Sequence, residues 1–143
     1  MRAAMGLELL VAMVVVGVSG VVLIVHLTGG SRRARLDGAA AARARFGVDF
    51  PDPGIMAVHL TKDGDAAFLA LDDRRVGIVA AIGDRFLTRM VGASDLADEP
   101  RVAGAVLTLH LRDFTWKGGS FTFAGEAEAR AVQQLLAGLR GRA

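Results

Sequence analysis

The feature that most constrains this chain is an uninterrupted apolar run near its N-terminus. From Leu9 to Ser31 there is no Asp, Glu, Lys or Arg, and valine and leucine dominate. A helix of about 20 apolar residues crosses a hydrocarbon core of about 30 Å. Because backbone groups in lipid must bond internally, the run should be helical despite its β-branched valines. We therefore predict a transmembrane helix over residues 5–30.

A cleaved signal peptide is the alternative interpretation of this segment. Signal peptides carry an apolar core of roughly 7–15 residues, and the present run is longer. The candidate cleavage site, Thr28-Gly29-Gly30, is a poor small-x-small match, and arginines follow it directly. These features favour an anchor that stays on the protein.

The positive charge of the chain is concentrated just behind the apolar run. The formal net charge is only +2, and from Phe46 onward acids slightly outnumber bases, which argues against nucleic acid as a partner. The positive-inside rule places the C-terminal part in the cytoplasm and the N-terminus outside. Absence of Asn, Tyr and Cys beside abundant Ala, Gly, Val and Arg is typical of GC-rich bacteria, so we expect a bacterial inner (cytoplasmic) membrane. The basic strip comprises Arg32, Arg33, Arg35, Arg43 and Arg45.

A stripe of polar and small residues runs along the predicted membrane helix. Glu8 and His26 are eighteen positions apart, which is five helical turns, so they share one face. Ser19 lies close to the same line, and Ala12 and Gly20 flank it. Such a stripe is typical of helix–helix contacts in lipid. In the alternative interpretation, Glu8 and His26 only mark the two membrane interfaces, about 27 Å apart.

Residues 31–54 are predicted to form a basic juxtamembrane helix and linker. Their alanines favour a helix, Gly47 is a plausible stop, and Pro51 and Pro53 mark a boundary. The arginines either lie along anionic lipid headgroups or serve only as a topology signal on a solvated linker helix. Membrane lipid is therefore one expected partner.

Residues 55–143 are predicted to form one small α+β domain, because the apolar period changes from helical to two. Asp63-Gly64 and Gly83-Asp84 are turn signals. Met56 is expected on the same strand face as Val58 and Leu60, and the almost wholly apolar segment 76–82 is expected to be central. The predicted strands are 55–61, 66–71, 76–82, 85–91, 105–111 and 120–124, with a marginal seventh near Arg101. A helix over Glu126–Arg140, with one apolar stripe, closes the domain.

This order of six or seven short antiparallel strands and a terminal helix resembles the pleckstrin-homology-like barrel of small bacterial proteins. The residues that carry the resemblance are Ala105–Asp113, Ser120–Ala124 and the helix Glu126–Leu139. The resemblance implies a scaffold for binding. Ligands of that family often approach the loops that join the first strands, but here those connections are tight and mixed in charge. Fold alone does not fix function.

The sequence carries no recognisable catalytic, metal or nucleotide motif. His59 and His110 lack ligand spacing, and a zinc site needs three or four ligands. Asp63-Gly64-Asp65 and Asp72-Asp73 are interpreted as hairpin turns, since no EF-hand loop surrounds them. Ser94 and Ser120 lack the context of a nucleophile. We therefore expect a protein that is not an enzyme and that needs no cofactor and no metal.

One local feature of the domain favours an interaction role. Phe114, Trp116 and Lys117 place two aromatic side chains and a cation in one turn, which either contacts a partner or folds back onto the barrel. Two functions are consistent with these observations. The first is an accessory subunit of a larger inner-membrane complex, docked on an integral membrane protein through the polar stripe. The second is a membrane-tethered sensor of a lipid headgroup or small ligand.

Overall fold

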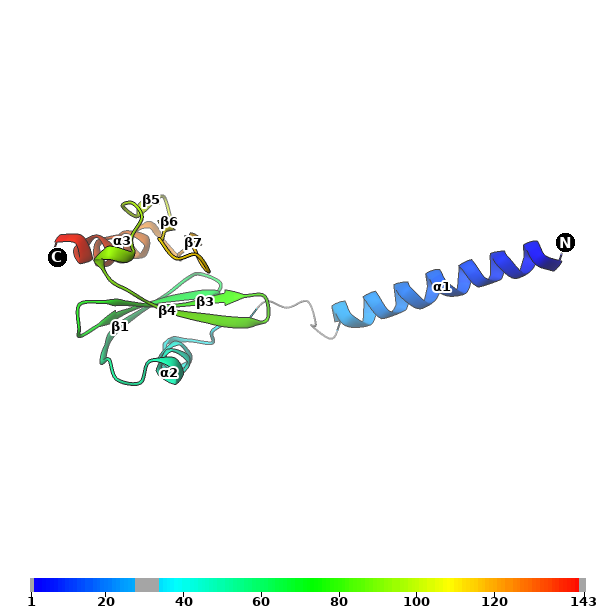
Figure 1. Ribbon diagram of the computed structural model, residues 1–143, viewed down its shortest axis with the longest axis horizontal. Helices are drawn as coiled ribbons and strands as arrows, with labels where there is room; N and C mark the ends of the chain where they lie inside the picture. Colours follow the sequence, from blue (N-terminus) through cyan, green and yellow to red (C-terminus); the bar gives the residue numbers. More distant parts are fainter. Residues whose placement is uncertain (1, 28–33, 142–143) are drawn as a thin grey trace. The chain divides into compact units, whose positions relative to one another are not determined.

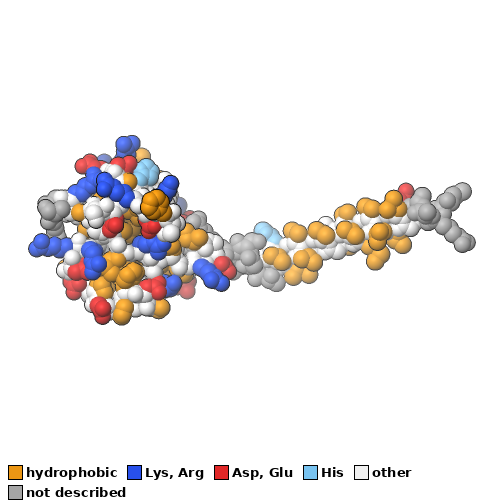
Figure 2. Space-filling view, in the orientation of Figure 1, with side chains coloured by type: hydrophobic (Ala, Val, Ile, Leu, Met, Phe, Trp, Pro, Cys, Tyr) orange, Lys and Arg blue, Asp and Glu red, His pale blue; other side chains and the backbone are white. Residues whose placement is uncertain are grey.

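Helix α1, Arg2–Leu27, is one unbroken helix (Figure 1). The structure, a computed structural model, describes residues 2–27 and 34–141, and the chain divides into two units, Met1–Arg32 and Arg33–Ala143. Within the described residues, Gly6–Leu27 is the one helix that is long and apolar enough to cross a membrane, with a mean hydropathy of 2.7. Membrane anchors and signal sequences share this length and composition. Figure 2 shows hydrophobic side chains along α1 wherever its side chains are described, whereas acidic and basic side chains intermingle on the second unit.

The second unit, called unit 2 below, is an α+β fold with seven antiparallel strands in two sheets. The first sheet has the order β1-β2-β3-β4 and the second the order β5-β6-β7. A short 3-10 helix, η1, links the sheets, helix α2 precedes them and helix α3 follows. The elements are α2 (Ala39–Asp49), β1 (Ile55–Leu60), β2 (Ala66–Leu71), β3 (Val76–Ile82), β4 (Arg85–Val91), η1 (Ala93–Asp95), β5 (Arg101–Ala103), β6 (Val106–His110), β7 (Gly118–Thr122) and α3 (Glu126–Gly141).

The expected succession of strands and terminal helix is confirmed, but the expected closed barrel is wrong. After β4 the chain passes through η1 and an irregular loop, rather than turning back to extend the first sheet. The sheets meet through isolated contacts: the amide of Lys62 donates to the carbonyl of Thr122 at 2.9 Å. A single bridge pairs Leu96, in the link between the sheets, with Leu111. Closure requires continuous pairing between edge strands, and the described residues do not provide it.

The larger core lies between the two sheets and α3. Strand β3 is central in its sheet, as its apolar sequence predicts, and directs Ile78 into this core beside Phe68 of β2. The ring of Phe68 meets that of Phe121 edge to face, with centroids 5.0 Å apart. Helix α3 presents the predicted apolar stripe, of which Val132 and Leu136 are fully buried. The burial of these side chains provides the main stabilisation of the unit.

Helix α2 covers the opposite face of the first sheet (Figure 1). Its Ala42 and Phe46 are completely buried. The ring of Phe46 lies over Gly77, where an added Cβ atom would come within 2.6 Å of it. The sequence places this helix in a solvated linker, whereas in the structure it packs on the sheet. The difference arises because Gly77, which has no side chain, leaves space for the ring of Phe46. The two residues are far apart in the sequence, so no local pattern predicts this contact.

Strand β1 contains an irregularity that changes which side chains face α2. The pairing register with β2 shifts between Ile55 and Ala57, as in a β-bulge. As a result Ile55, Val58 and Leu60 pack together toward the core under α2. Met56, which was expected to share a face with Val58 and Leu60, is 71% exposed instead. A bulge inserts one residue and reverses the alternation on one side of it.

Candidate functional site

The polar stripe predicted on the membrane helix lies on one continuous face of α1. Because α1 has no break, Glu8 and His26 are joined by five regular turns. Two shallow hollows lie along this face. The first is lined by Leu7, Glu8, Val11, Ala12, Val15 and Val16, and the second by Val18, Ser19, Val22, Leu23 and His26. Gly20, which was expected on this face, lines neither hollow and lies about 120° round the helix from Glu8.

The hollows have a simple cause in the sequence. Ala12 and Ser19 are small, and the larger side chains next to them project further from the helix, so that a shallow groove forms over the small residues. Sequence reasoning missed Val15 and Val22, which lie on the same face. With these two, the face repeats at alternating steps of four and three residues, the spacing of a left-handed helix pair. That spacing was readable from the chain.

The five arginines of the basic strip do not act as one group. Arg32 and Arg33 lie outside the described residues, and Arg35 is exposed. Arg43 donates from Nη1 to the carbonyl of Ile55 at 3.1 Å. Arg45 pairs with Asp49 at 3.1 Å and also donates to the carbonyl of Phe86. Two of the five therefore have contacts within unit 2 that hold α2 on the sheet.

The predicted contact loop joins β6 to β7, and its three residues differ in how far they are exposed. Phe114 is 99% exposed. Trp116 is half-buried against the larger core, with its ring centroid 6.2 Å from that of Phe121. Lys117 is exposed, while its carbonyl accepts from the amide of Leu111 at 2.9 Å. The tryptophan thus folds back and the phenylalanine does not.

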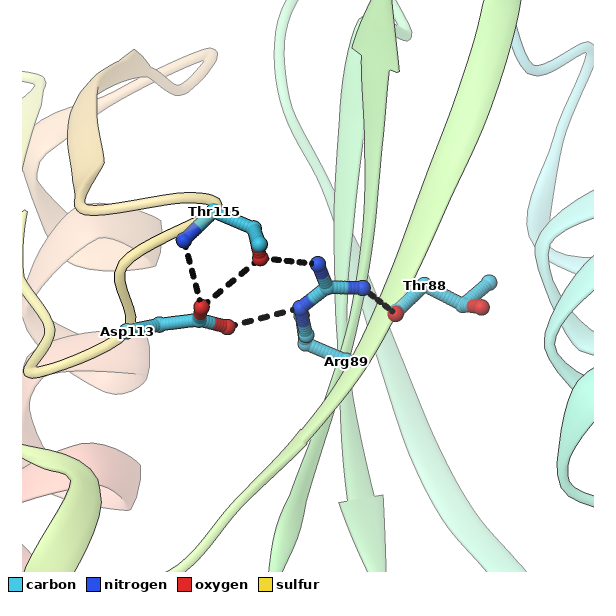
Figure 3. A network of polar contacts seen from close by, with 4 residues as sticks. All are labelled: Thr88, Arg89, Asp113 and Thr115. Atoms are coloured by element: carbon cyan, nitrogen blue, oxygen red, sulfur yellow. Dashed lines mark hydrogen bonds and ion pairs between the residues drawn. The ribbon is translucent and has the colours of Figure 1, made fainter.

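A polar network at the base of this loop connects it to β4 (Figure 3). Asp113 accepts through Oδ1 from the amide and hydroxyl of Thr115, at 2.8 and 2.7 Å. Its Oδ2 accepts from Nε of Arg89 at 2.8 Å, and Nη2 of Arg89 donates to the Thr115 hydroxyl. The bonds from Thr115, together with Arg89, hold the pKa of Asp113 far below its usual range. The network was not predicted, because its partners are distant in sequence.

The other carboxyl groups with lowered pKa values also have structural partners. A hydrogen bond from the hydroxyl of Thr88 is the main cause of the lowered pKa of Asp49. Asp98 has a lowered pKa chiefly because His110 lies 3.0 Å away. These lowered pKa values result from hydrogen bonds and charge interactions that join separate segments of unit 2. Within the described residues, no group of three or more His, Asp or Glu is placed to hold a metal ion.

Comparison with known proteins does not assign the chain to a family. No protein-family model matches it, and no curated protein or solved structure matches it either. Two surfaces of the protein are candidates for function, the grooved face of α1 and the β6–β7 loop.

Proposed function

We propose that this protein is a non-catalytic, single-pass membrane protein that serves as an accessory subunit of a larger complex in a bacterial cytoplasmic membrane. In this proposal α1 is a retained anchor that also docks on a helix of an integral membrane partner. The docking face comprises Glu8, Ala12, Ser19 and His26, with Val15 and Val22 between them. The length of the apolar run and the poor cleavage site after it favour an anchor over a signal peptide.

The observation that carries the proposal is the pair of hollows along this face of α1. A ridge of side chains from a second helix fits a groove whose floor is formed by small residues such as Ala12 and Ser19. Between helices in lipid, association depends on close packing and on polar contacts, since lipid is as apolar as leucine. Glu8 and His26 supply polar contacts at the two ends of the groove.

Unit 2 supports a binding role rather than catalysis. Its partnered carboxylates hold elements together, and its order of four strands, three strands and a helix is the order on which the resemblance to pleckstrin-homology-like domains rests. We propose a binding scaffold of that kind in which the two sheets are not closed into a barrel. Such a scaffold presents loops and edges to a partner.

We also propose that unit 2 lies in the cytoplasm. Arginines directly follow the apolar run, whereas the short N-terminal segment offers Arg2 and the α-amino group against Glu8. A C-terminal alkaline phosphatase fusion should be inactive, and a C-terminal green fluorescent protein fusion should fluoresce. An active phosphatase fusion would reverse the orientation.

The docking proposal is tested by extraction of the full chain in mild detergent, followed by affinity recovery. Wild-type protein should bring down membrane proteins in fixed stoichiometry. The variant Ala12→Leu/Ser19→Leu should insert normally, because leucine favours the membrane, but should lose the partner. The matched control is Val14→Leu/Val21→Leu, which places two leucines at the same spacing on other faces and should keep it.

Two results would count against the docking proposal. Equal loss in both double variants would mean that no face of α1 is special. Recovery of the wild-type protein alone, together with binding of a lipid headgroup or small ligand to unit 2, would instead support the membrane-tethered sensor.

A further inference from the structure

Phe114 is the most exposed large hydrophobic side chain in the part of the chain that forms unit 2. It is 99% exposed, compared with 74% for Val48, 71% for Met56 and 51% for Ile82. Isolated exposed apolar residues are common on protein surfaces. Phe114 is notable because of how rigidly the chain around it is built and where that chain lies.

The residues on both sides of Phe114 are fixed by hydrogen bonds. At the base of the loop, the amide of Leu111 donates to the carbonyl of Lys117. Nearer the tip, Asp113 and Thr115 bond to one another and both bond to Arg89 of β4 (Figure 3). The ring is therefore held outward by an ordered support. A group presented in this way loses little conformational entropy when it binds.

The β6–β7 loop crosses the side of unit 2 formed by the edge strand β4. Arg89, to which Asp113 and Thr115 bond, lies four residues along β4 from Arg85 at the β3–β4 turn. Trp116 and Ile82, the latter next to that turn, line one open groove of about 260 Å³. The amide of Ala34 donates to the carbonyl of Gly83 in the same turn at 2.7 Å, so the chain enters unit 2 there, and Phe114 lies beside β4.

A bilayer that holds α1 is within reach of unit 2. Seven peptide links join Leu27 to Ala34. An extended chain spans at most about 3.6 Å per residue, so the tether extends no further than about 25 Å. A surface so close is at high effective concentration, which allows weak contacts to form.

The charges around Phe114 fit the headgroup region of a membrane. Arg112 and Lys117 are exposed on either side of it, and the charge of Asp113 is already paired with Arg89. An aromatic ring with flanking cations suits the boundary between lipid tails and phosphates, where the ring is buried and the cations stay hydrated. Asp84 is exposed in the neighbouring turn, so the apolar contact, rather than net charge, provides most of the attraction.

We infer that Phe114 inserts into the interfacial layer of the bilayer that holds α1, with Arg112 and Lys117 at the level of the lipid phosphates. This inference rests on the proposed role of α1 as a retained anchor. The contact gives unit 2 a defined orientation on the membrane.

The absence of cysteine from the chain makes a direct test possible. Phe114→Cys and Val48→Cys each introduce a single site for an environment-sensitive nitrobenzoxadiazole label in the full-length protein. Both proteins are reconstituted into vesicles of phosphatidylcholine and phosphatidylglycerol, with and without brominated acyl chains. The label at 114 should lose most of its emission to the brominated lipid, and the label at 48 should lose little. Because both sites carry the same label, its own affinity for lipid is controlled.

Each other outcome would overturn the inference. Equal quenching at 114 and 48, or quenching at neither, would show that Phe114 has no special contact with lipid. Shielding of the 114 label from aqueous iodide in native membranes but not in pure lipid vesicles would assign Phe114 to a protein partner instead. Flotation of the same vesicles reports on α1 separately. A chain that floats without quenching at 114 would refute only the loop contact, whereas a chain that does not float would refute both the anchor and the contact.

Discussion

Replacing Phe46 by alanine tests whether α2 is part of the fold or only a linker. The side chain is completely buried, lies against Gly77 and stacks on Phe50 with ring centroids 5.0 Å apart. Truncation of a core phenylalanine removes its transfer free energy and leaves a cavity, at a cost of about 3–5 kcal/mol. Since domains are stable by only about 5–15 kcal/mol, the variant should lose a large part of its free energy of unfolding.

Unfolding by urea, followed by the emission of Trp116, measures this loss in the full chain in detergent. Trp116 is the only tryptophan and packs in the core on the far side of the sheet from α2, so it reports on the fold and not on the mutated site. The control is Val48→Ala on the same helix, a residue 74% exposed, which should change the stability by less than about 0.5 kcal/mol. A loss below about 1 kcal/mol for Phe46→Ala, or an equal loss for the control, would mean that α2 is a solvated linker.

Two further substitutions test individual contacts by the same unfolding measurement. Gly77→Ala should destabilise unit 2 by about 1–3 kcal/mol, because the new methyl group meets the ring of Phe46; an unchanged stability would contradict the packing of that ring. Asp113→Asn should destabilise unit 2 at pH 7, and the loss should shrink only as the pH falls well below 4 toward the folded pKa of Asp113. The lowered pKa of Asp113 gives stability that is present above the unfolded pKa of about 4 and is lost as the pH falls toward the folded one. A difference from wild type that is as large at about pH 2 as at pH 7 would argue against the bonds of Asp113 to Thr115 and Arg89.

The sequence predicted most of the local structure because the local signals agree with the fold. Strands β2, β3 and β4 begin and end where the apolar runs do, between turns that contain Gly64 and Gly83. Both glycines adopt a positive φ, which other residues rarely do. Helix α3 carries acids in its first turn and an arginine in its last, in agreement with its dipole.

Features that depend on distant partners were not predictable. The bulge in β1 follows from its pairing with β2, and no residue near Met56 predicts it. The packing of α2 depends on a glycine in β3, thirty-one positions after the phenylalanine that it accommodates. Whether two sheets close into a barrel depends on strand tilt and stagger across the whole set.

In the candidate surfaces, too, the features set by local sequence were predictable and those set by distant contacts were not. The residues that face one way on α1 follow from helical geometry alone, and Val15 and Val22 were overlooked rather than hidden. In the β6–β7 loop, composition singled out Phe114 and Trp116. Only the fold shows that Phe114 is exposed and that Trp116 packs against the core. The support from Arg89 joins residues twenty-four positions apart, and no spacing rule connects them.

Photocrosslinking along α1 in native membranes tests the docking claim most directly. A photoreactive amino acid is placed at each position from 9 to 25 in turn, and adducts with other membrane proteins are measured. The account predicts strong adducts at positions 12, 15, 19 and 22, with the four-and-three spacing of the groove, and weak ones at 14 and 21. Adducts of equal strength at all positions, or adducts only between copies of this chain, would contradict docking of this face on a partner.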